Sequence, residues 1–323
     1  NVIPQRKGYS FLGKSRLYKG KHSLQETLFN PPQLMEEQHI PYSKIVDLLE
    51  INPGDVLFVT SDISRLAFHT IRAEGGFDPN LFIDSLMQKL GSEGTLLFPA
   101  YNFLLESGDK FDIKKSKPFL CGALSMAAWQ RPDFRRTKHP LHSFLVWGKY
   151  CGQLCAMENK SSFGDDSPFA FMHRHKAKML CIDIDLWGSF TFIHYIEQME
   201  NVGYRFRKKI LIDYTAESGA VSTNEYYVFK KFPGIEMVFH RMEKIMKNHG
   251  VFTDVCINNS LFRIIPLDDN TFSFFINDIR NNKGRNIARF NFVYFLKDIA
   301  RPVLKKLSFF KPLNEKISHA SGI

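Results

Sequence analysis

Two short runs of apolar residues predict buried strands in the first third of the chain. They read VLFVT at residues 56–60 and TLLFPAY at residues 95–101, and both are apolar enough to be covered on both faces. Between them, FDPNLFIDSLMQKLG at residues 77–91 has the spacing of an amphipathic helix, with Asp78 as its cap and Gly91 after its end. The order strand, helix, strand predicts a parallel sheet covered by helices.

The pattern of apolar residues changes further along the chain. Runs at residues 141–148 and 177–184 predict two more strands, and residues 190–202 read as a helix. After residue 209 we expect antiparallel strands around a helix at residues 235–248, namely KILIDYTA, STNEYYVF, VCINNSLFRIIPL and TFSFFIND. Other helices are expected at residues 41–50, from about Ser61, and at residues 287–300, where Arg301-Pro302 would end the last of them.

The charge is concentrated at the two ends of the chain. The formal net charge is +10, but residues 1–22 carry +6 and residues 280–323 carry +8, which leaves −4 for residues 23–279. We therefore expect an irregular basic segment at residues 1–36, one large domain at residues 37–279, and a basic, aromatic tail from residue 280. Because the basic residues lie at the ends, they do not indicate a nucleic-acid partner, and solvated tails explain them equally well.

Composition narrows the class of protein. A chain of 323 residues with 44% hydrophobic residues can bury its own core. It has neither an apolar run of the roughly 18 residues that span a bilayer nor an apolar signal segment at its start. Its five cysteines form no C-x-x-C pair, and no GxGxxG or GxxxxGK[ST] motif occurs, so zinc, nicotinamide and P-loop sites are not predicted. We expect a cytoplasmic protein without a metal.

A series of short motifs occurs in order between residues 41 and 209. They read NPGDVLFVTSDIS, GSEGTLLFPAY, FDIKKS, CGALS, RPDFRRTKHPLHSF, FGDDSPF and TFIHYIEQ. The series resembles the aminoglycoside 3-N-acetyltransferase family, and its most specific part is the Arg-x-x-His-Pro-x-x-Ser core of Arg136, His139, Pro140 and Ser143. The resemblance implies a three-layer α/β/α fold with additional antiparallel strands in the C-terminal part. It also implies transfer of an acetyl group from acetyl-CoA to the amine of a small-molecule acceptor.

The resemblance places the general base at His139. An amine must be, or become, neutral in order to attack a thioester, and an imidazole with a pKa near 6.5 accepts a proton at neutral pH. We expect Glu197 to orient this base, and His194, which shares a helix face with Glu197, to contact the substrate. Ser143 either donates to the thioester oxygen or caps the turn. His142 either contacts the acceptor or packs in the core.

The end of the first predicted strand is the expected site for the pyrophosphate of CoA. Ser61, Asp62, Ile63 and Ser64 follow that strand at a helix start, where free backbone N–H groups and the helix dipole attract phosphate. Asp62 would repel phosphate, so we expect its side chain to cap the helix. Tyr101, at the end of the second strand, is also assigned to the cofactor. The alternative is that Ser61 and Asp62 are caps only.

The acceptor site is expected near the loop FGDDSPF and the run VGYRFRK. Ser167 would cap the helix that follows the loop and would border the acceptor. Tyr204 and Arg205 would hold a carboxylate or phosphate of the acceptor, because a guanidinium group offers a bidentate fork. A surface salt bridge is the alternative for Arg205.

Three positions depart from the pattern of the family. Leu141 and Met126 stand where members carry acidic residues, and Thr60 stands where a histidine is usual. Aminoglycosides are polycations whose sites are lined with carboxylates, so the loss of the two acidic residues argues against a drug acceptor. We therefore predict N-acetylation of an amino sugar, either free or nucleotide-linked, for a surface glycan. The alternatives are an aminoglycoside-resistance acetyltransferase and a non-catalytic relative that binds CoA or sugar.

The C-terminal tail interleaves basic and aromatic residues. Within Arg285–Phe310, Ile287, Phe290 and Tyr294 recur near helical spacing among lysines and arginines. Such a segment either lies peripherally in the interface of an anionic membrane or packs on the catalytic domain. The sequence leaves the oligomeric state open.

Overall fold

The computed structural model describes residues 39–308, with side chains described as far as residue 300. The basic segment expected at residues 1–36 therefore lies outside the described residues. The helices are α1 (Tyr42–Ile45), the 3₁₀ helix η1 (Val46–Leu48), α2 (Ser64–Glu74), α3 (Pro79–Leu90), α4 (Ala123–Gln130), α5 (Cys151–Ala156), α6 (Pro168–Arg174), α7 (Leu186–Ser189), α8 (Ile193–Met199), α9 (Phe239–Asn248), α10 (Asp269–Asn282) and α11 (Phe292–Ser308). The strands are β1 (Val56–Ser61), β2 (Thr95–Tyr101), β3 (Lys110–Asp112), β4 (Arg135–Arg136), β5 (His142–Gly148), β6 (Lys178–Ile182), β7 (Arg205–Thr215), β8 (Val221–Lys231), β9 (Ile235–Met237), β10 (Thr253–Ile257), β11 (Ser260–Pro266) and β12 (Ala288–Phe290).

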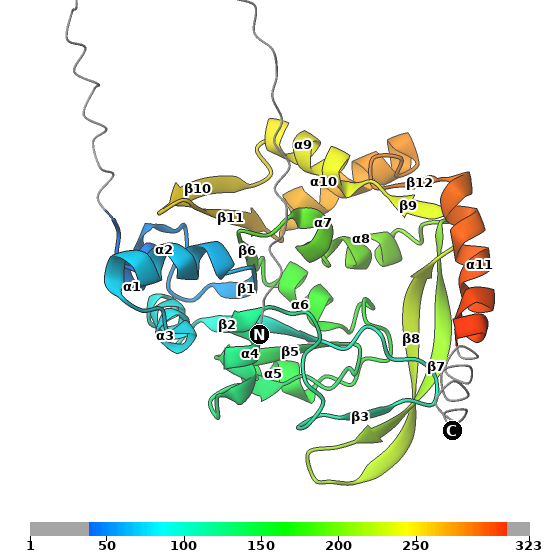
Figure 1. Cartoon of the computed structure of the whole chain (residues 1–323), viewed down its shortest axis with the longest axis horizontal. Helices are drawn as coiled ribbons and strands as arrows, with labels where there is room; N and C mark the ends of the chain where they lie inside the picture. The colour runs from blue at the N-terminus through cyan, green and yellow to red at the C-terminus, as the bar shows by residue number, and fades with distance from the viewer. Residues whose placement is uncertain (1–38, 309–323) are drawn as a thin grey trace, which may run out of the picture. The chain divides into compact units, whose positions relative to one another are not determined.

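A seven-stranded mixed sheet forms the centre of the domain (Figure 1). Its strand order is β10-β11-β6-β1-β2-β5-β4, with β1 parallel to β2 and to β6. The two apolar runs are β1 and β2, and both are buried along their whole length. The strand expected at residues 141–148 also forms, but it runs antiparallel to β2, so the prediction of a parallel sheet holds only for the three central strands.

Helices cover both faces of this sheet. Alternate residues of β1 point to opposite faces, so that Phe58 joins one hydrophobic cluster while Leu57 and Val59 join the other. The first cluster includes residues of α5, α6, α8, α9 and α10, and the second includes residues of α1, α2, α3 and α4. The expected three-layer α/β/α architecture is therefore confirmed.

Helix α3 forms for the local reasons that its sequence indicates. The Asp78 side chain accepts a hydrogen bond from the Asn80 backbone N–H at 2.8 Å, and Pro79 occupies the first turn. Gly91 ends the helix with a φ of +66°, which favours glycine. The helix expected at residues 41–50 is shorter and divided, because α1 passes directly into η1.

Antiparallel strands make up much of the C-terminal half, as expected. Strands β7 and β8 form a long ribbon (Figure 1) that β3 extends, and β10 and β11 form a hairpin around Asn258 and Asn259. The segment TFSFFIND, expected as a strand, is instead part of α10. The Asp268 side chain caps this helix by accepting from the Thr271 N–H at 3.0 Å, and Thr271, Phe275 and Asp278 recur with helical spacing on its buried side.

The boundary expected at residue 279 lies inside α10. Beyond it, Ile287 is fully buried in the first cluster, and β12 pairs with β9 before α11 begins. The helix expected at residues 287–300 is displaced toward the C-terminus and continues through Pro302 rather than ending before it. The tail up to Phe290 is therefore part of the fold, because its apolar side chain at position 287 fills the core.

Candidate active site

A cavity of about 920 Å³ lies at the carboxyl ends of β1 and β2. Ligands bind at this end of the strands in open α/β sheets. One wall comes from the loop between β6 and α8, and the end of β8 contributes the wall across from it. Among the residues that line the cavity are Thr60, Ser61, Tyr101, Cys121, His142, Thr191, His194, Arg205, Phe229, Lys230 and Asp298.

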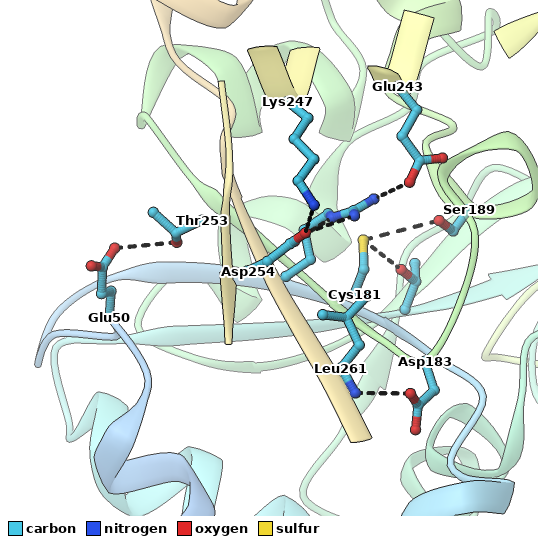
Figure 2. Close-up of polar contacts among 11 residues, drawn as sticks. Glu50, Cys181, Asp183, Ser189, Glu243, Lys247, Thr253, Asp254 and Leu261 are labelled. Atoms are coloured by element: carbon cyan, nitrogen blue, oxygen red, sulfur yellow. Dashed lines mark hydrogen bonds and ion pairs between the residues drawn. The ribbon is translucent and has the colours of Figure 1, made fainter. Parts of the chain in front are cut away.

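The loop between β6 and α8, which includes the short helix α7, carries Ser189 and Thr191 to the cavity wall. Asp183 fixes the start of this loop, because its carboxylate accepts a hydrogen bond from the Leu261 N–H at 2.8 Å (Figure 2). The same close-up shows Cys181, whose Sγ lies 4.0 Å from Ser189 Oγ. Burial raises the pKa of Cys181 to about 11, so this cysteine is a neutral thiol at neutral pH, and it packs behind the cavity wall.

His194 faces the cavity with its imidazole held by a buried carboxylate. Its Nδ1 lies 2.6 Å from Glu197 Oε2, and its Nε2 has no hydrogen-bond partner among the described residues. Glu197 is fully buried and also accepts a hydrogen bond from the Tyr204 hydroxyl at 3.0 Å. Arg205 Nε lies 2.7 Å from the same Oε2 atom, which completes a buried ion pair.

The charges of this cluster determine how it titrates. Burial alone would raise the pKa of Glu197, but His194, Arg205 and Tyr204 together lower it below its ordinary value, so the carboxylate stays ionised. Burial and the Arg205 charge lower the pKa of His194, against the opposing effect of Glu197. His194 is therefore a neutral imidazole at neutral pH, and its free Nε2 can accept a proton.

His142 also lines the cavity but has a different partner. Its Nδ1 lies 2.8 Å from Ser162 Oγ, and its ring packs on Phe163 with the centroids 4.8 Å apart. Burial lowers the pKa of His142 well below the ordinary value. The imidazole is therefore neutral. The position of His142 allows both roles that the sequence left open, namely contact with a bound molecule and packing in the core.

His139 is buried behind the cavity wall. Its side chain is 1% exposed, its Nε2 lies 3.4 Å from Ser162 Oγ, and its ring packs edge-on against Tyr226. Burial lowers the pKa of His139 to about 3. Glu197 does not contact His139, so the expected pairing of these two residues was wrong: Glu197 orients His194 instead.

Ser143 has a structural position in β5. Its hydroxyl donates to the Ala100 carbonyl at 2.7 Å and accepts from Arg136 Nε at 2.8 Å, and its side chain is fully buried. The expected donation to a thioester oxygen is not available, because the hydroxyl hydrogen is already used. Arg136 also donates to the carbonyl of Ala100 and to Asn102 Oδ1, both at 2.7 Å, so the motif's arginine and serine join β5 to β2.

The four residues assigned to the CoA pyrophosphate divide into different environments. Ser61 lines the cavity, whereas Ile63 is buried in the second cluster. The Asp62 carboxylate accepts from the N–H of Ser64, the first residue of α2, at 3.0 Å, and hydrogen bonds to Ser64 lower its pKa, although the cap position itself is Ile63 rather than Ser61 or Asp62. The motif CGALS requires a glycine at position 122. Its φ is +86°, and a Cβ there would come within 2.5 Å of the Ser61 carbonyl oxygen.

Ser167 forms the expected cap of α6. Its Oγ accepts from the Ala170 N–H at 3.3 Å and donates to the Gly164 carbonyl at 2.6 Å, and its side chain is fully buried. It does not line the cavity, so contact with an acceptor there is not available to it. Arg205 does line the cavity, but as the partner of buried Glu197 and not in a surface salt bridge.

Several lining residues were not predicted from the sequence. Lys230 and Phe229 reach the cavity only because the β7–β8 ribbon folds back over it, which no local pattern indicates. Cys121 could have been suspected, since it precedes Gly122 in a recognised motif. Within residues 39–308, no cluster of three or more His, Cys, Asp or Glu side chains could hold a metal, and every helix is too short or too polar to cross a bilayer.

Comparisons with known proteins agree with this geometry. Solved structures with the same fold include AAC-IIIb in a binary complex with CoASH (17% identity, TM-score 0.62, covering 75% of this chain and 95% of that chain). They also include the apoenzyme of aminoglycoside acetyltransferase AAC(3)-IVa (19%, 0.59, 77% and 92%) and the YokD protein from Bacillus subtilis (17%, 0.61, 74% and 95%). A search of curated proteins finds no match.

The chain thus has the α/β/α fold of these structures, with a cavity at the carboxyl ends of its central strands. The family model described as aminoglycoside 3-N-acetyltransferase matches residues 58–271, and the chain belongs to this family. It is accordingly an N-acetyltransferase whose co-substrate is acetyl-CoA.

Proposed function

We propose that the protein transfers the acetyl group of acetyl-CoA to an amino group of a sugar that carries negative charge, with His194 as the general base. The charge of the cavity carries this proposal. Arg205, Lys230 and Lys231 are the cations of its lining, and Asp298 is the carboxylate among the described residues there. The charge of Arg205 is compensated by Glu197, Lys231 donates to the Ile235 carbonyl at 2.6 Å, and Asp298 accepts from the Gly234 N–H at 3.1 Å, so Lys230 is the lining cation left for an acceptor.

The buried cluster supplies the proton transfer. The acceptor amine attacks the carbonyl carbon of the thioester, so that an N–C bond forms while the C–S bond breaks. His194 Nε2 removes the proton that the amine nitrogen must lose, and the Glu197 carboxylate stabilises the imidazolium that results. The same proton then neutralises the departing CoA thiolate, so His194 is ready for the next cycle.

The assignment of His139 as the base stays a prediction, but the geometry favours His194. Only His194 combines a free ring nitrogen at the cavity with a carboxylate on the other nitrogen. His139 reaches the cavity indirectly, since Ser162 Oγ lies between it and His142. We propose that His139 positions His142 through Ser162.

A second candidate function is acetylation of an aminoglycoside antibiotic. The family description favours it, and related structures contain apramycin, a gentamicin and sisomicin as their bound molecules. A polycationic acceptor requires carboxylates, and the cavity offers lysines instead. The non-catalytic relative considered from the sequence is not proposed, because the chain belongs to a family of N-acetyltransferases.

A series of acceptors of increasing negative charge tests the proposal. With acetyl-CoA saturating, kcat/KM is expected to be at least about tenfold higher for glucosamine 6-phosphate or UDP-glucosamine than for glucosamine, because a charge-assisted hydrogen bond is worth roughly 1.5–3 kcal/mol. Gentamicin should react more slowly than any of them. Faster turnover of gentamicin would contradict the charged-sugar acceptor and establish the second candidate.

A lysine attracts the phosphates of the acceptor and of CoA alike. Substitution of Lys230 therefore distinguishes recognition of the acceptor from recognition of CoA. If it holds the acceptor, Lys230→Gln raises KM for glucosamine 6-phosphate and leaves the Kd of CoA unchanged. The matched control is Lys208→Gln, since Lys208 is exposed on the neighbouring strand and does not line the cavity. An increase in the Kd of CoA alone would place the CoA phosphates at Lys230.

Direct transfer is expected, without an acetylated enzyme. Cys121 is the thiol that lines the cavity, and burial raises its pKa to about 11, so it is a poor nucleophile at neutral pH. Cys121→Ala should therefore keep kcat within about threefold of the wild type. Mass spectrometry of enzyme mixed with acetyl-CoA should find no protein-bound acetyl group, and an acetyl group on Cys121 that is lost on adding amine would overturn direct transfer.

The proposals for the cofactor pyrophosphate at Ser61–Ser64, the glycan pathway and the oligomeric state stay predictions. Contact with a membrane also stays a prediction. Helix α11 does expose apolar side chains of the kind that an interfacial helix buries, including Phe292, Val293, Leu296 and Ile299.

A further inference from the structure

Tyr101 lines the active-site cavity beside a histidine, and its hydroxyl group is buried at the cavity wall. It ends β2, and its backbone partner in the antiparallel pair with β5 is His142, so both side chains project from the same face of the sheet. The two rings pack edge-on with centroids 5.0 Å apart, and Phe144 supports the tyrosine ring from another side at 5.6 Å. Tyr101 is 7% exposed and lines the cavity.

The hydroxyl of Tyr101 donates no hydrogen bond to any described residue. A buried hydroxyl without a partner costs roughly 1–3 kcal/mol, so its retention calls for an explanation. Burial raises the pKa of Tyr101 well above its ordinary value, and the nearby Cys121 adds to this effect, while hydrogen bonding from the Thr191 side chain opposes it. The group therefore keeps its proton, and no described residue accepts it.

The reaction needs such a donor. When the amine nitrogen bonds to the carbonyl carbon of acetyl-CoA, the carbonyl oxygen gains negative charge before the C–S bond breaks and the charge leaves with sulfur. Donors placed at that oxygen make one of the largest contributions to acyl transfer. Ser143, the donor expected from the sequence, cannot serve, because its hydroxyl already donates to the Ala100 carbonyl.

We propose that the Tyr101 hydroxyl donates a hydrogen bond to the thioester carbonyl oxygen and stabilises the charge that develops on it. His194 removes the amine proton, and Tyr101 acts on the oxygen of the same carbonyl group, so the two residues have separate tasks. The role depends on acetyl transfer alone and not on the charged-sugar acceptor. It also gives a function to the strand-end position that pairs with His142.

The substitution Tyr101→Phe tests this role, because it removes one hydroxyl that donates no hydrogen bond within the protein and keeps the ring that packs on His142 and Phe144. We expect kcat to fall by about 10²-fold, the loss typical of one oxyanion donor. The melting temperature should stay equal or rise, since an unpartnered buried hydroxyl is removed. The Kd of CoA, which lacks the acetyl carbonyl, should stay within about twofold of the wild type.

The loss should not depend on the acceptor, which separates this proposal from the acceptor proposal. The same fold decrease is expected with glucosamine 6-phosphate, with gentamicin and for hydrolysis of acetyl-CoA by water. A binding measurement needs no turnover: S-acetonyl-CoA, a ketone analogue of acetyl-CoA, should bind about 3–10-fold more weakly to Tyr101→Phe than to the wild type, because one neutral hydrogen bond is lost.

Tyr214 provides the matched control. Its hydroxyl is also buried without a partner among the described residues, but it lines a separate cavity of about 470 Å³. Tyr214→Phe should leave kcat and the affinity for S-acetonyl-CoA unchanged. The proposal is overturned if Tyr101→Phe keeps wild-type kcat and binds S-acetonyl-CoA as tightly as the wild type, or if Tyr214→Phe loses as much.

Discussion

The variant His194→Ala is expected to lower kcat by about 10²–10⁴-fold, the contribution typical of a positioned general base. Its imidazole lines the cavity, and buried Glu197 holds its Nδ1 at 2.6 Å, so the free Nε2 is the nitrogen that takes the amine proton. The Kd of CoA should barely change. Steady-state kinetics with saturating acetyl-CoA, and calorimetric binding of CoA, measure the two quantities.

His142 and His139, the other histidines at or behind the cavity wall, serve as controls for this result. His142→Ala should act mainly on KM, because its Nδ1 is paired with Ser162 and no carboxylate supports it. His139→Ala should lower kcat less than His194→Ala and lower stability, since its ring is buried against Tyr226. A loss of kcat that is larger for His139→Ala than for His194→Ala would restore His139 as the base.

The pH dependence of kcat should follow from the shifted pKa of His194. Burial lowers this pKa, so the imidazole remains neutral and competent as pH falls below its ordinary pKa near 6.5. The acid limb of kcat is therefore expected below pH 6.5, and activity declines only as the pH falls through the lowered pKa. Because Glu197 acts to raise the pKa of His194, its neutralisation should move this limb to still lower pH.

Glu197→Gln should impair both catalysis and folding. The amide cannot compensate the positive charge of Arg205, whose side chain is 7% exposed, so the free energy of unfolding should fall by about 3 kcal/mol, as when one partner of a buried ion pair is lost. The fall in kcat should be about 10²-fold, because the imidazolium at His194 loses its carboxylate. Denaturant unfolding and steady-state kinetics give the two values.

A second substitution separates these two effects. Adding Arg205→Met to Glu197→Gln removes the orphaned charge and should recover part of the stability, whereas kcat should stay low. The matched control is Glu225→Gln, which breaks the ion pair of Glu225 with Lys209 on the exposed ribbon and should leave stability and kcat near wild type. Recovery of kcat in the double variant would show that Glu197 acts only through the fold.

Local sequence signals predicted the elements whose causes are local. The apolar runs of β1 and β2 required burial on both faces, and Asp78 with Gly91 fixed the ends of α3. The segment TFSFFIND was misread because its phenylalanines resemble a strand, whereas the Asp268 cap and the burial of Phe275 decide for helix α10. The antiparallel direction of β5 could not be predicted, since it depends on pairing with a distant strand.

The candidate site was predictable only in part: of the residues expected there, Ser61, Tyr101, His142, His194 and Arg205 line the cavity. The spacing of His194 and Glu197 on one helix face correctly indicated that they share a surface, and the structure brings them into contact. The histidine beside Pro140 was chosen as the base because the motif is specific. Burial decides which histidine reaches the cavity, however, and burial depends on how Tyr226 of β8 covers His139, a contact between segments far apart in the sequence.

Chemical rescue of a His194→Gly variant tests the central claim most directly, because it asks whether the missing group is a base in the cavity. Added imidazole should restore part of the acetyl-transfer rate, in proportion to the concentration of its neutral form, and the same concentrations should not accelerate His139→Gly. Both variants must first show an unfolding transition and CoA binding like those of the wild type. Rescue of His139→Gly with no rescue of His194→Gly would contradict the assignment of the base to His194.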